Sequence, residues 1–135
     1  MAGDLVAVWL PPGPAFVDEL RRAWDADDAV LPVDARLPRQ AVDRLVESLA
    51  PVRVVSSPGD AVSVPGGGRP VETGDAVVVA TSGTTGASKG VVLTHDALAA
   101  SSAATSSFLG IDPNRHHWLC CLPVAHVGGL GVITR

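Results

Sequence analysis

The sequence predicts an α/β fold in which a mainly parallel β-sheet is flanked by helices. Short, nearly continuous apolar runs alternate with segments whose apolar residues recur at helical spacing, and the joins between them are short. Such apolar runs are typical of strands that are buried on both faces. The order strand, helix, strand, helix, strand is that of a parallel sheet built from right-handed crossovers.

Each element of the first half follows from its own pattern. Residues 5–10 form an apolar run that ends at two prolines, which predicts the first strand. In residues 14–26 the apolar side chains recur at helical spacing, which predicts a helix. Residues 29–33 and 52–55 predict the second and third strands, and residues 38–49, with one apolar face, predict the second helix.

The second half holds a longer connection and further strands. Residues 56–74 are rich in Gly, Pro and Ser, and we expect an irregular connection there. Residues 75–80 have the pattern of a deeply buried strand, and residues 91–94 are β-rich and too short for a helix. Residues 117–122 predict one more strand, and the glycine-dense residues 127–133 begin a further element.

A third helix is expected over about residues 96–108. Thr94 or His95 lies near its start and Gly110 lies beyond its end, as helix termini prefer. The face of this helix consists of Ala and Ser, which predicts close packing against a neighbouring element.

Composition narrows the class of protein. At 135 residues, the chain is one domain or a piece of something larger, and its 47% hydrophobic content is enough for a buried core. The formal charge of -4, without a basic block, argues against a nucleic acid or an anionic membrane as the main partner. No run is long enough to span a membrane and the start does not resemble a signal peptide, so we expect a cytoplasmic protein. The sequence does not indicate whether the protein is a monomer or an oligomer.

The aromatic and sulfur-containing side chains look structural. Trp9, Trp24 and Trp118 lie in or beside apolar runs and are expected in the core. Cys120 and Cys121 are adjacent, so on a strand they would point to opposite faces and be poorly placed to bridge. We expect buried free thiols.

Lys89 is the sole lysine of the chain and ends a stretch rich in glycine and hydroxyl side chains, Thr81-Ser82-Gly83-Thr84-Thr85-Gly86-Ala87-Ser88-Lys89-Gly90. Glycine lets successive N–H groups point inward, hydroxyls add short donors, and lysine adds a mobile charge. This composition favours a loop that wraps a polyphosphate over a surface turn with an incidental lysine. The spacing excludes a Walker A loop, and a dinucleotide fingerprint is excluded because the loop leads from strand to strand.

Residues 80–91 resemble the AMP-binding signature of the adenylate-forming acyl-CoA synthetases, adenylation domains and luciferases. Residues 31–38 resemble an early proline-rich region of that family, with Asp34 and Ala35 in place of the usual Asn-Pro. Residues 122–129 are similar to its "LPLFHVGG" block, with Val-Ala in place of the bulky pair before the histidine. Leu93-Thr94-His95 before a helix also fits.

The resemblance implies an ATP-dependent reaction. A carboxylate attacks the α-phosphorus of ATP, and the resulting acyl-adenylate passes to a thiol, usually that of coenzyme A. The loop would hold the β- and γ-phosphates together with Mg²⁺, and Lys89 and Thr81 would act in catalysis. The residues expected to bind the nucleotide are Thr81, Ser82, Gly83, Thr84, Thr85, Gly86 and Lys89.

The histidines receive different roles. Through the resemblance, His126 would line the pocket for the carboxylic acid, together with Gly128 and Gly129. His95 is expected to cap or pack at a helix start, and His116 and His117 to lie on the solvated surface. The chain itself is expected to provide no metal site.

The resemblance further implies that residues 1–135 are the N-terminal part of an AMP-binding domain, whose remainder and C-terminal lid domain would lie beyond. The isolated chain is then expected to lack ligase activity and to bind ATP weakly. Within the family, the pattern looks most like the o-succinylbenzoate–CoA ligases of menaquinone biosynthesis. Two alternatives stay open: a non-catalytic nucleotide-binding module, and a flavodoxin-like interaction domain.

Overall fold

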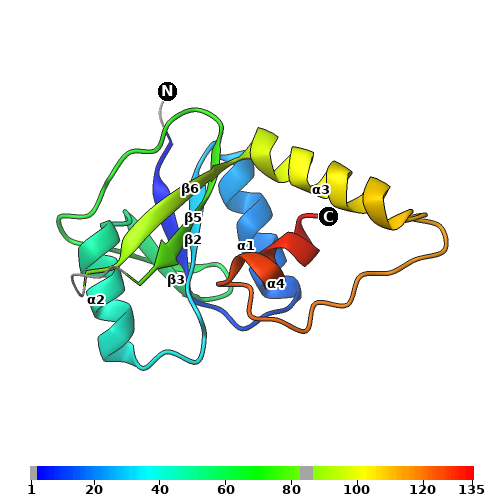
Figure 1. The fold of residues 1–135 in the computed structure, drawn as a ribbon. Coiled ribbons are helices and arrows are strands. Elements are labelled where there is room, and N and C mark those ends of the chain that lie inside the picture. The colour runs from blue at the N-terminus through cyan, green and yellow to red at the C-terminus, as the bar shows by residue number, and fades with distance from the viewer. Residues whose placement is uncertain (1–2, 83–86) are drawn as a thin grey trace.

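A six-stranded sheet with helices on both faces forms the centre of the described part of the molecule (Figure 1). The structure is a computed structural model, and it describes residues 3–82 and 87–135. The strands are ordered β4-β3-β1-β2-β5-β6 across the sheet. The strands are β1 Leu5–Val8, β2 Ala29–Pro32, β3 Arg53–Ser57, β4 Asp60–Ser63, β5 Asp75–Thr81 and β6 Lys89–Thr94. The helices are α1 Pro14–Asp25, α2 Arg39–Leu49, α3 His95–Leu109 and α4 Val127–Ile133.

The middle of the sheet is parallel and its two edges are antiparallel. Strand β1 pairs in parallel with β2 and β3, and β2 pairs in parallel with β5. Strand β6 returns antiparallel along β5, and β4 returns antiparallel along β3. The predicted mainly parallel sheet and the strand-to-strand loop are therefore confirmed.

Two apolar layers hold the helices on opposite faces of the sheet. Along β1, Val6 and Val8 point into the layer under α1 and α4, whereas Leu5 and Ala7 point into the layer under α2. Helix α1 covers its face with Phe16, which is fully buried, and neighbouring apolar side chains. The expectation that the first strand is buried on both faces is confirmed, because a period-2 backbone with apolar side chains throughout serves both layers.

The prediction of an irregular connection over residues 56–74 is wrong where the chain forms strand β4. Strand β4 forms a hairpin with β3, and all four of its residues are exposed. The strand is held by backbone pairing at an edge and contributes no buried side chain, so it leaves no apolar pattern in the sequence.

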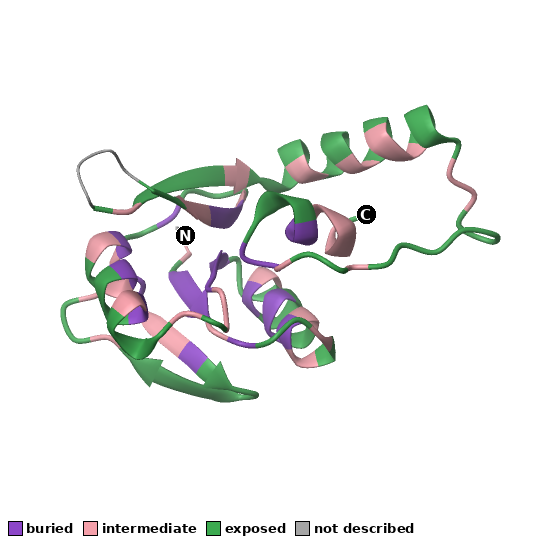
Figure 2. Cartoon of the chain, turned by 60° about the horizontal axis from the view of Figure 1, so that its bottom comes forward, coloured by how far each residue is buried: buried purple, intermediate pink, exposed green. Residues whose placement is uncertain are grey.

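Helix α3 is mostly exposed and has only half-buried residues on one side, among them Leu98, contrary to the close packing expected of its Ala/Ser face (Figure 2). Its ends are as expected: the Thr94 side chain accepts a hydrogen bond from the Ala97 N–H, and Gly110 adopts the left-handed conformation. The Ser102 hydroxyl lies 3.0 Å from the Thr134 carbonyl oxygen and ties the helix to the end of α4. Within the described chain, no α3 side chain is buried.

The strand predicted over residues 117–122 is absent from the described structure, where this segment is irregular and not paired with the sheet. Consequently Trp118 and Cys121 are exposed and Cys120 is half-buried, which corrects the expectation of a core tryptophan and buried thiols. The Cys120 thiol donates to the Gly129 carbonyl oxygen at 3.5 Å. Trp24 is half-buried, and its indole N–H donates to the Ala76 carbonyl oxygen at 2.9 Å. Trp9 is also half-buried.

Candidate functional site

The hairpin formed by β5 and β6 carries the glycine-rich loop. Thr81 and Lys89 face each other in register at the base of this loop, and the Thr81 hydroxyl donates to the Lys89 carbonyl oxygen at 3.3 Å. The Lys89 side chain is exposed. The expected phosphate ligands Gly83, Thr84, Thr85 and Gly86 lie outside the described residues.

A cavity of about 510 Å³ lies at the end of the hairpin, and we call it the loop-end pocket. The loop contributes Thr81, Ser82 and Ser88 to its wall. Parallel strands β2 and β5 both end here, which is where open α/β sheets place ligands. The remaining lining residues come from the ends of β2 and β5, from the segment after β2, from α2 and from the residues just before α4: Pro32, Asp34, Leu37, Ala41, Arg44, Leu45, Ser48, Ala80, Ala125 and His126.

His126 reaches this pocket as the residue that precedes the first turn of α4. Its side chain is exposed, so it is free to contact a ligand. The structure thus brings His126 together with Thr81 and Ser82. Its role toward a substrate stays a prediction.

Gly128 and Gly129 do not line the loop-end pocket. Gly129 is buried, and a Cβ atom there would lie 2.3 Å from the Pro123 carbonyl oxygen and 2.5 Å from that of Leu122. Real Cβ atoms do not approach backbone so closely, so α4 seats on the preceding turn only with glycine at this position. Their assignment to the substrate site stays a prediction.

Asp34 is the carboxylate in the described wall of the pocket, and Arg36 holds it. The Arg36 Nη2 atom lies 2.7 Å from Asp34 Oδ2, and the Arg36 backbone N–H donates to Oδ1 at 2.9 Å. The side-chain and backbone hydrogen bonds from Arg36 lower the pKa of Asp34 to about 2, and the charge of His126 acts in the same direction. At neutral pH the Asp34 carboxylate is therefore ionised, and its negative charge is balanced by the Arg36 guanidinium.

Arg44 and Ser48 were missed by the sequence analysis. They lie four residues apart on α2, so they share a helix face that is turned toward the pocket. The signal was present as a polar pair at this spacing, but the sequence does not show that α2 lies beside the loop.

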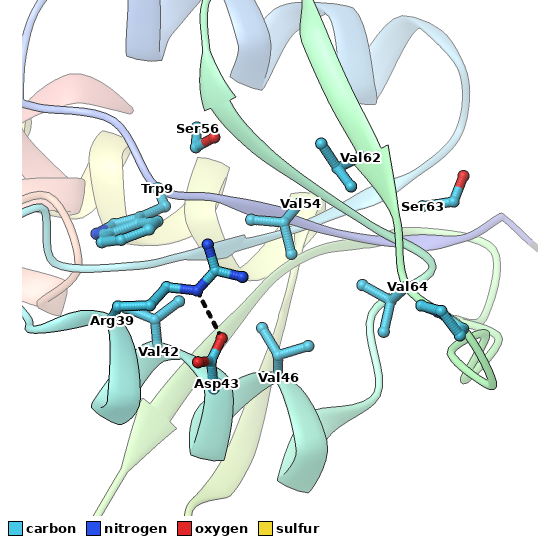
Figure 3. A pocket seen from close by; sticks show the side chains of 11 residues that line it. Trp9, Arg39, Val42, Asp43, Val46, Val54, Ser56, Val62, Ser63 and Val64 are labelled. Atoms are coloured by element: carbon cyan, nitrogen blue, oxygen red, sulfur yellow. Dashed lines mark hydrogen bonds and ion pairs between the residues drawn. The ribbon is translucent and has the colours of Figure 1, made fainter.

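A second cavity, of about 290 Å³, lies on the other side of α2 and is mostly apolar (Figure 3). Trp9, Val54 and Val62 form part of its wall. The Arg39 guanidinium at its rim is paired with Asp43, with 2.7 Å between Nε and Oδ1. A guanidinium that already binds a carboxylate is a poor phosphate ligand, and none of the predicted site residues is here, so the loop-end pocket is the candidate site.

The other three histidines do not line the loop-end pocket. The rings of His95 and Trp24 pack edge to face, with centroids 4.9 Å apart, which confirms the packing role of His95. His116 and His117 are exposed, and His116 Nδ1 accepts a hydrogen bond from the Asp112 N–H. Among residues 3–82 and 87–135, no three His, Cys, Asp or Glu side chains gather closely enough to hold a metal ion. In the same residues, no helix has the length and apolar character needed to cross a membrane.

Comparison with known proteins decides the family. Residues 68–134 match the family described as AMP-binding enzyme. Residues 68–134 belong to this family. The AMP-binding match covers residues 80–91 and 122–129, which carried the resemblance in the sequence, but it does not reach residues 31–38.

Two curated relatives match different shares of this chain. The probable non-canonical nonribosomal peptide synthetase CymA of Salinispora arenicola is 40% identical over 111 residues, which are 79% of this chain and 1% of that protein. The 2-succinylbenzoate–CoA ligase of Bacillus cytotoxicus is 43% identical over 58 residues, which are 43% of this chain and 12% of that protein. The chain therefore spans a small part of the relatives it matches.

Solved structures share the fold. The o-succinylbenzoate CoA synthetase MenE of Bacillus subtilis, in complex with ATP and magnesium ion, superposes with a TM-score of 0.76 at 19% identity, over 98% of this chain and 41% of that one. ATP-bound MatB from Rhodopseudomonas palustris superposes with a TM-score of 0.74 at 22% identity, over 99% of this chain and 33% of that one. The chain thus has the fold of the N-terminal region of adenylate-forming enzymes.

Proposed function

We propose that this chain is the part of an ATP-dependent ligase that holds the phosphates of ATP and one wall of the carboxylic acid site. One observation carries the proposal. The loop-end pocket brings Thr81, Ser82 and Ser88 of the AMP-binding signature opposite His126, at the ends of β2 and β5. Thr81, Ser82 and His126, which the family resemblance assigned to the two substrates, thus line one cavity.

The chemistry fits the residues present. When a carboxylate attacks the α-phosphorus of ATP, negative charge accumulates on the departing pyrophosphate. Hydroxyl donors at fixed positions and the Lys89 ammonium would stabilise that charge. Bound Mg²⁺ would share it, held by phosphate oxygens, because Asp34 in the described pocket wall is already taken by Arg36.

The proposed acceptor of the acyl group is coenzyme A, and the proposed acid is o-succinylbenzoate. The relative from Bacillus cytotoxicus is named as a 2-succinylbenzoate–CoA ligase, and MenE has the same fold. The similarity to a nonribosomal peptide synthetase covers more of this chain and supports a second candidate, an adenylation domain of such a synthetase. We also propose that the protein is located in the cytoplasm.

We further propose that residues 1–135 are the N-terminal part of an AMP-binding domain. Beyond the partial coverage of relatives, the surface supports this, because large apolar side chains are exposed along α3 and the segment after it. Phe108 is 90% exposed and Leu119 is 81% exposed. Patches of this kind mark surfaces that another element covers, and the rest of the domain would supply that element.

The decisive experiment is ATP–pyrophosphate exchange by the protein translated from the complete reading frame. A panel of carboxylic acids would include o-succinylbenzoate and amino acids. Exchange that depends on an aromatic or aliphatic carboxylic acid without an amino group supports the CoA ligase. Exchange that depends on an amino acid supports the synthetase domain. The absence of exchange with every acid, in a folded protein that binds ATP, would leave a non-catalytic nucleotide-binding module as the function.

A further inference from the structure

Arg44 presents an unengaged positive charge to the loop-end pocket. The residue belongs to α2, and its side chain is exposed at the pocket wall. Within residues 3–82 and 87–135, no carboxylate lies within ion-pair distance of its guanidinium. By contrast, Arg39 on the same helix is paired with Asp43. Of these two arginines, Arg44 is therefore the one whose charge is available to a ligand.

Packing fixes α2, and with it Arg44, beside the phosphate loop. Val42, Leu45 and Leu49 are buried in the apolar layer under the helix. Leu49 also lies against β6, because a Cβ atom on Gly90 would be 3.3 Å from the Leu49 Cδ2 atom. Figure 1 shows α2 alongside the ends of β5 and β6 at which the loop departs and returns. The position of Arg44 is thus set by the core and not by a flexible segment.

The charges around the pocket leave Arg44 unopposed. Asp34 is bound by Arg36, so its negative charge is neutralised within a few ångströms. The loop side of the pocket offers the hydroxyls of Ser82 and Ser88, which donate to anions as readily as they accept from cations, whereas the Thr81 hydroxyl donates to the Lys89 carbonyl oxygen. A guanidinium opposite hydroxyl donors is a combination suited to phosphate oxygens, since its planar fork binds two of them at once.

We propose that Arg44 is a phosphate ligand that binds the pyrophosphate portion of ATP in the loop-end pocket. This inference rests on the proposed function, because it places the nucleotide's phosphates at the loop. It adds a second cation, from a helix outside the AMP-binding signature, to the Lys89 ammonium of the loop. The interaction is with the leaving group and not with the adenylate.

The test is a titration of the ¹⁵N-labelled chain with inorganic pyrophosphate, followed by NMR. The Arg44 side-chain Nε–H resonance is expected to shift on binding. Arg44→Gln is expected to weaken pyrophosphate binding about three- to tenfold, the scale for one charge-assisted contact at an exposed site. Arg44→Lys should recover part of the affinity, since it keeps the charge but loses the fork.

Arg39→Gln is the matched control, because it removes an arginine from the same helix at the cavity without site residues. It should leave pyrophosphate affinity unchanged. A parallel titration with AMP should give the same affinity for Arg44→Gln and for the unmodified chain. The backbone spectrum of each variant reports whether the fold is kept.

The outcomes separate this inference from the proposed function. If Lys89→Ala weakens pyrophosphate binding and Arg44→Gln does not, Arg44 is not a ligand and the proposed function stands. If neither substitution matters, or if pyrophosphate moves no resonance at the pocket, both ideas are overturned. If Arg44→Gln weakens the binding of AMP and of pyrophosphate equally, the proposal that Arg44 contacts the leaving group is wrong.

Discussion

The Thr81 hydroxyl donates to the main-chain carbonyl oxygen of Lys89, across the base of the hairpin that carries the phosphate loop. The two residues are also in register in the β5–β6 pair. This bond closes the loop with the backbone of Lys89 and leaves its ammonium free to turn toward a ligand. The lysine side chain can therefore be changed without removing the closing contact.

Lys89→Ala is expected to slow ATP–pyrophosphate exchange by the complete protein about ten- to a thousand-fold, the scale for one preorganised charge contact in a transition state. The fold should be unaffected, because the side chain is exposed and the Thr81 bond goes to the backbone. Circular dichroism of the variant provides the control. An unchanged exchange rate would place the phosphates elsewhere.

Gly129→Ala is expected to lower the free energy of unfolding by about 1–3 kcal/mol, the scale for overpacking a tight contact. The added methyl group would meet the carbonyl oxygens of Pro123 and Leu122, which are backbone atoms and cannot swing aside. Gly128→Ala is the matched control: its nearest neighbour is the Leu122 Cδ1 atom, at 3.0 Å on a flexible side chain. Urea unfolding of both variants measures the difference, and equal losses would refute the packing role of Gly129.

Asp34→Asn is expected to destabilise the fold near neutral pH but not in strong acid. Arg36 lowers the folded-state pKa of Asp34 to about 2, below the ordinary value of 3.8. The ionised carboxylate therefore stabilises the fold above about pH 4, and that contribution is lost as the pH falls toward 2. Asparagine keeps the oxygen that accepts from the Arg36 backbone N–H, so the change isolates the charge.

Urea unfolding at about pH 6 and about pH 2.5 measures this difference. Arg36 is 72% exposed, so added salt should also reduce the effect of Asp34→Asn at the higher pH. A difference between the variant and the unmodified chain that stays constant with pH would contradict the assignment of the low pKa to this pair.

Arg53→Ala is expected to cost about 2 kcal/mol of stability, because it leaves the Asp28 carboxylate without its charged partner. The Asp28 side chain is 8% exposed and also accepts from the Asp4 N–H at 2.9 Å. Arg39→Ala breaks an ion pair whose members are 78% and 57% exposed, and should cost about 0.5 kcal/mol or less. Thermal unfolding of both variants measures their stabilities. A larger loss of stability for Arg39→Ala than for Arg53→Ala would contradict the expectation that the more buried ion pair contributes more.

Local patterns predicted the elements whose side chains are buried. Helices α1 and α2 follow their apolar spacing to within a residue or two, and β1 follows an apolar run. The failures have the opposite character. Strand β4 is exposed throughout and held by backbone pairing alone, while residues 117–122 have strand-like side chains but no neighbouring strand to pair with.

The sequence by itself determined the glycine- and hydroxyl-rich hairpin with its single lysine, because turn chemistry and the flanking strands are local properties. Only the tertiary structure decided which distant residues share a cavity with it. Parallel pairing of β2 and β5 puts the ends of both strands at one edge of the sheet, which brings Asp34 to the loop. Packing of α2 and α4 on opposite faces then adds Arg44 and His126, a meeting that no spacing along the chain encodes.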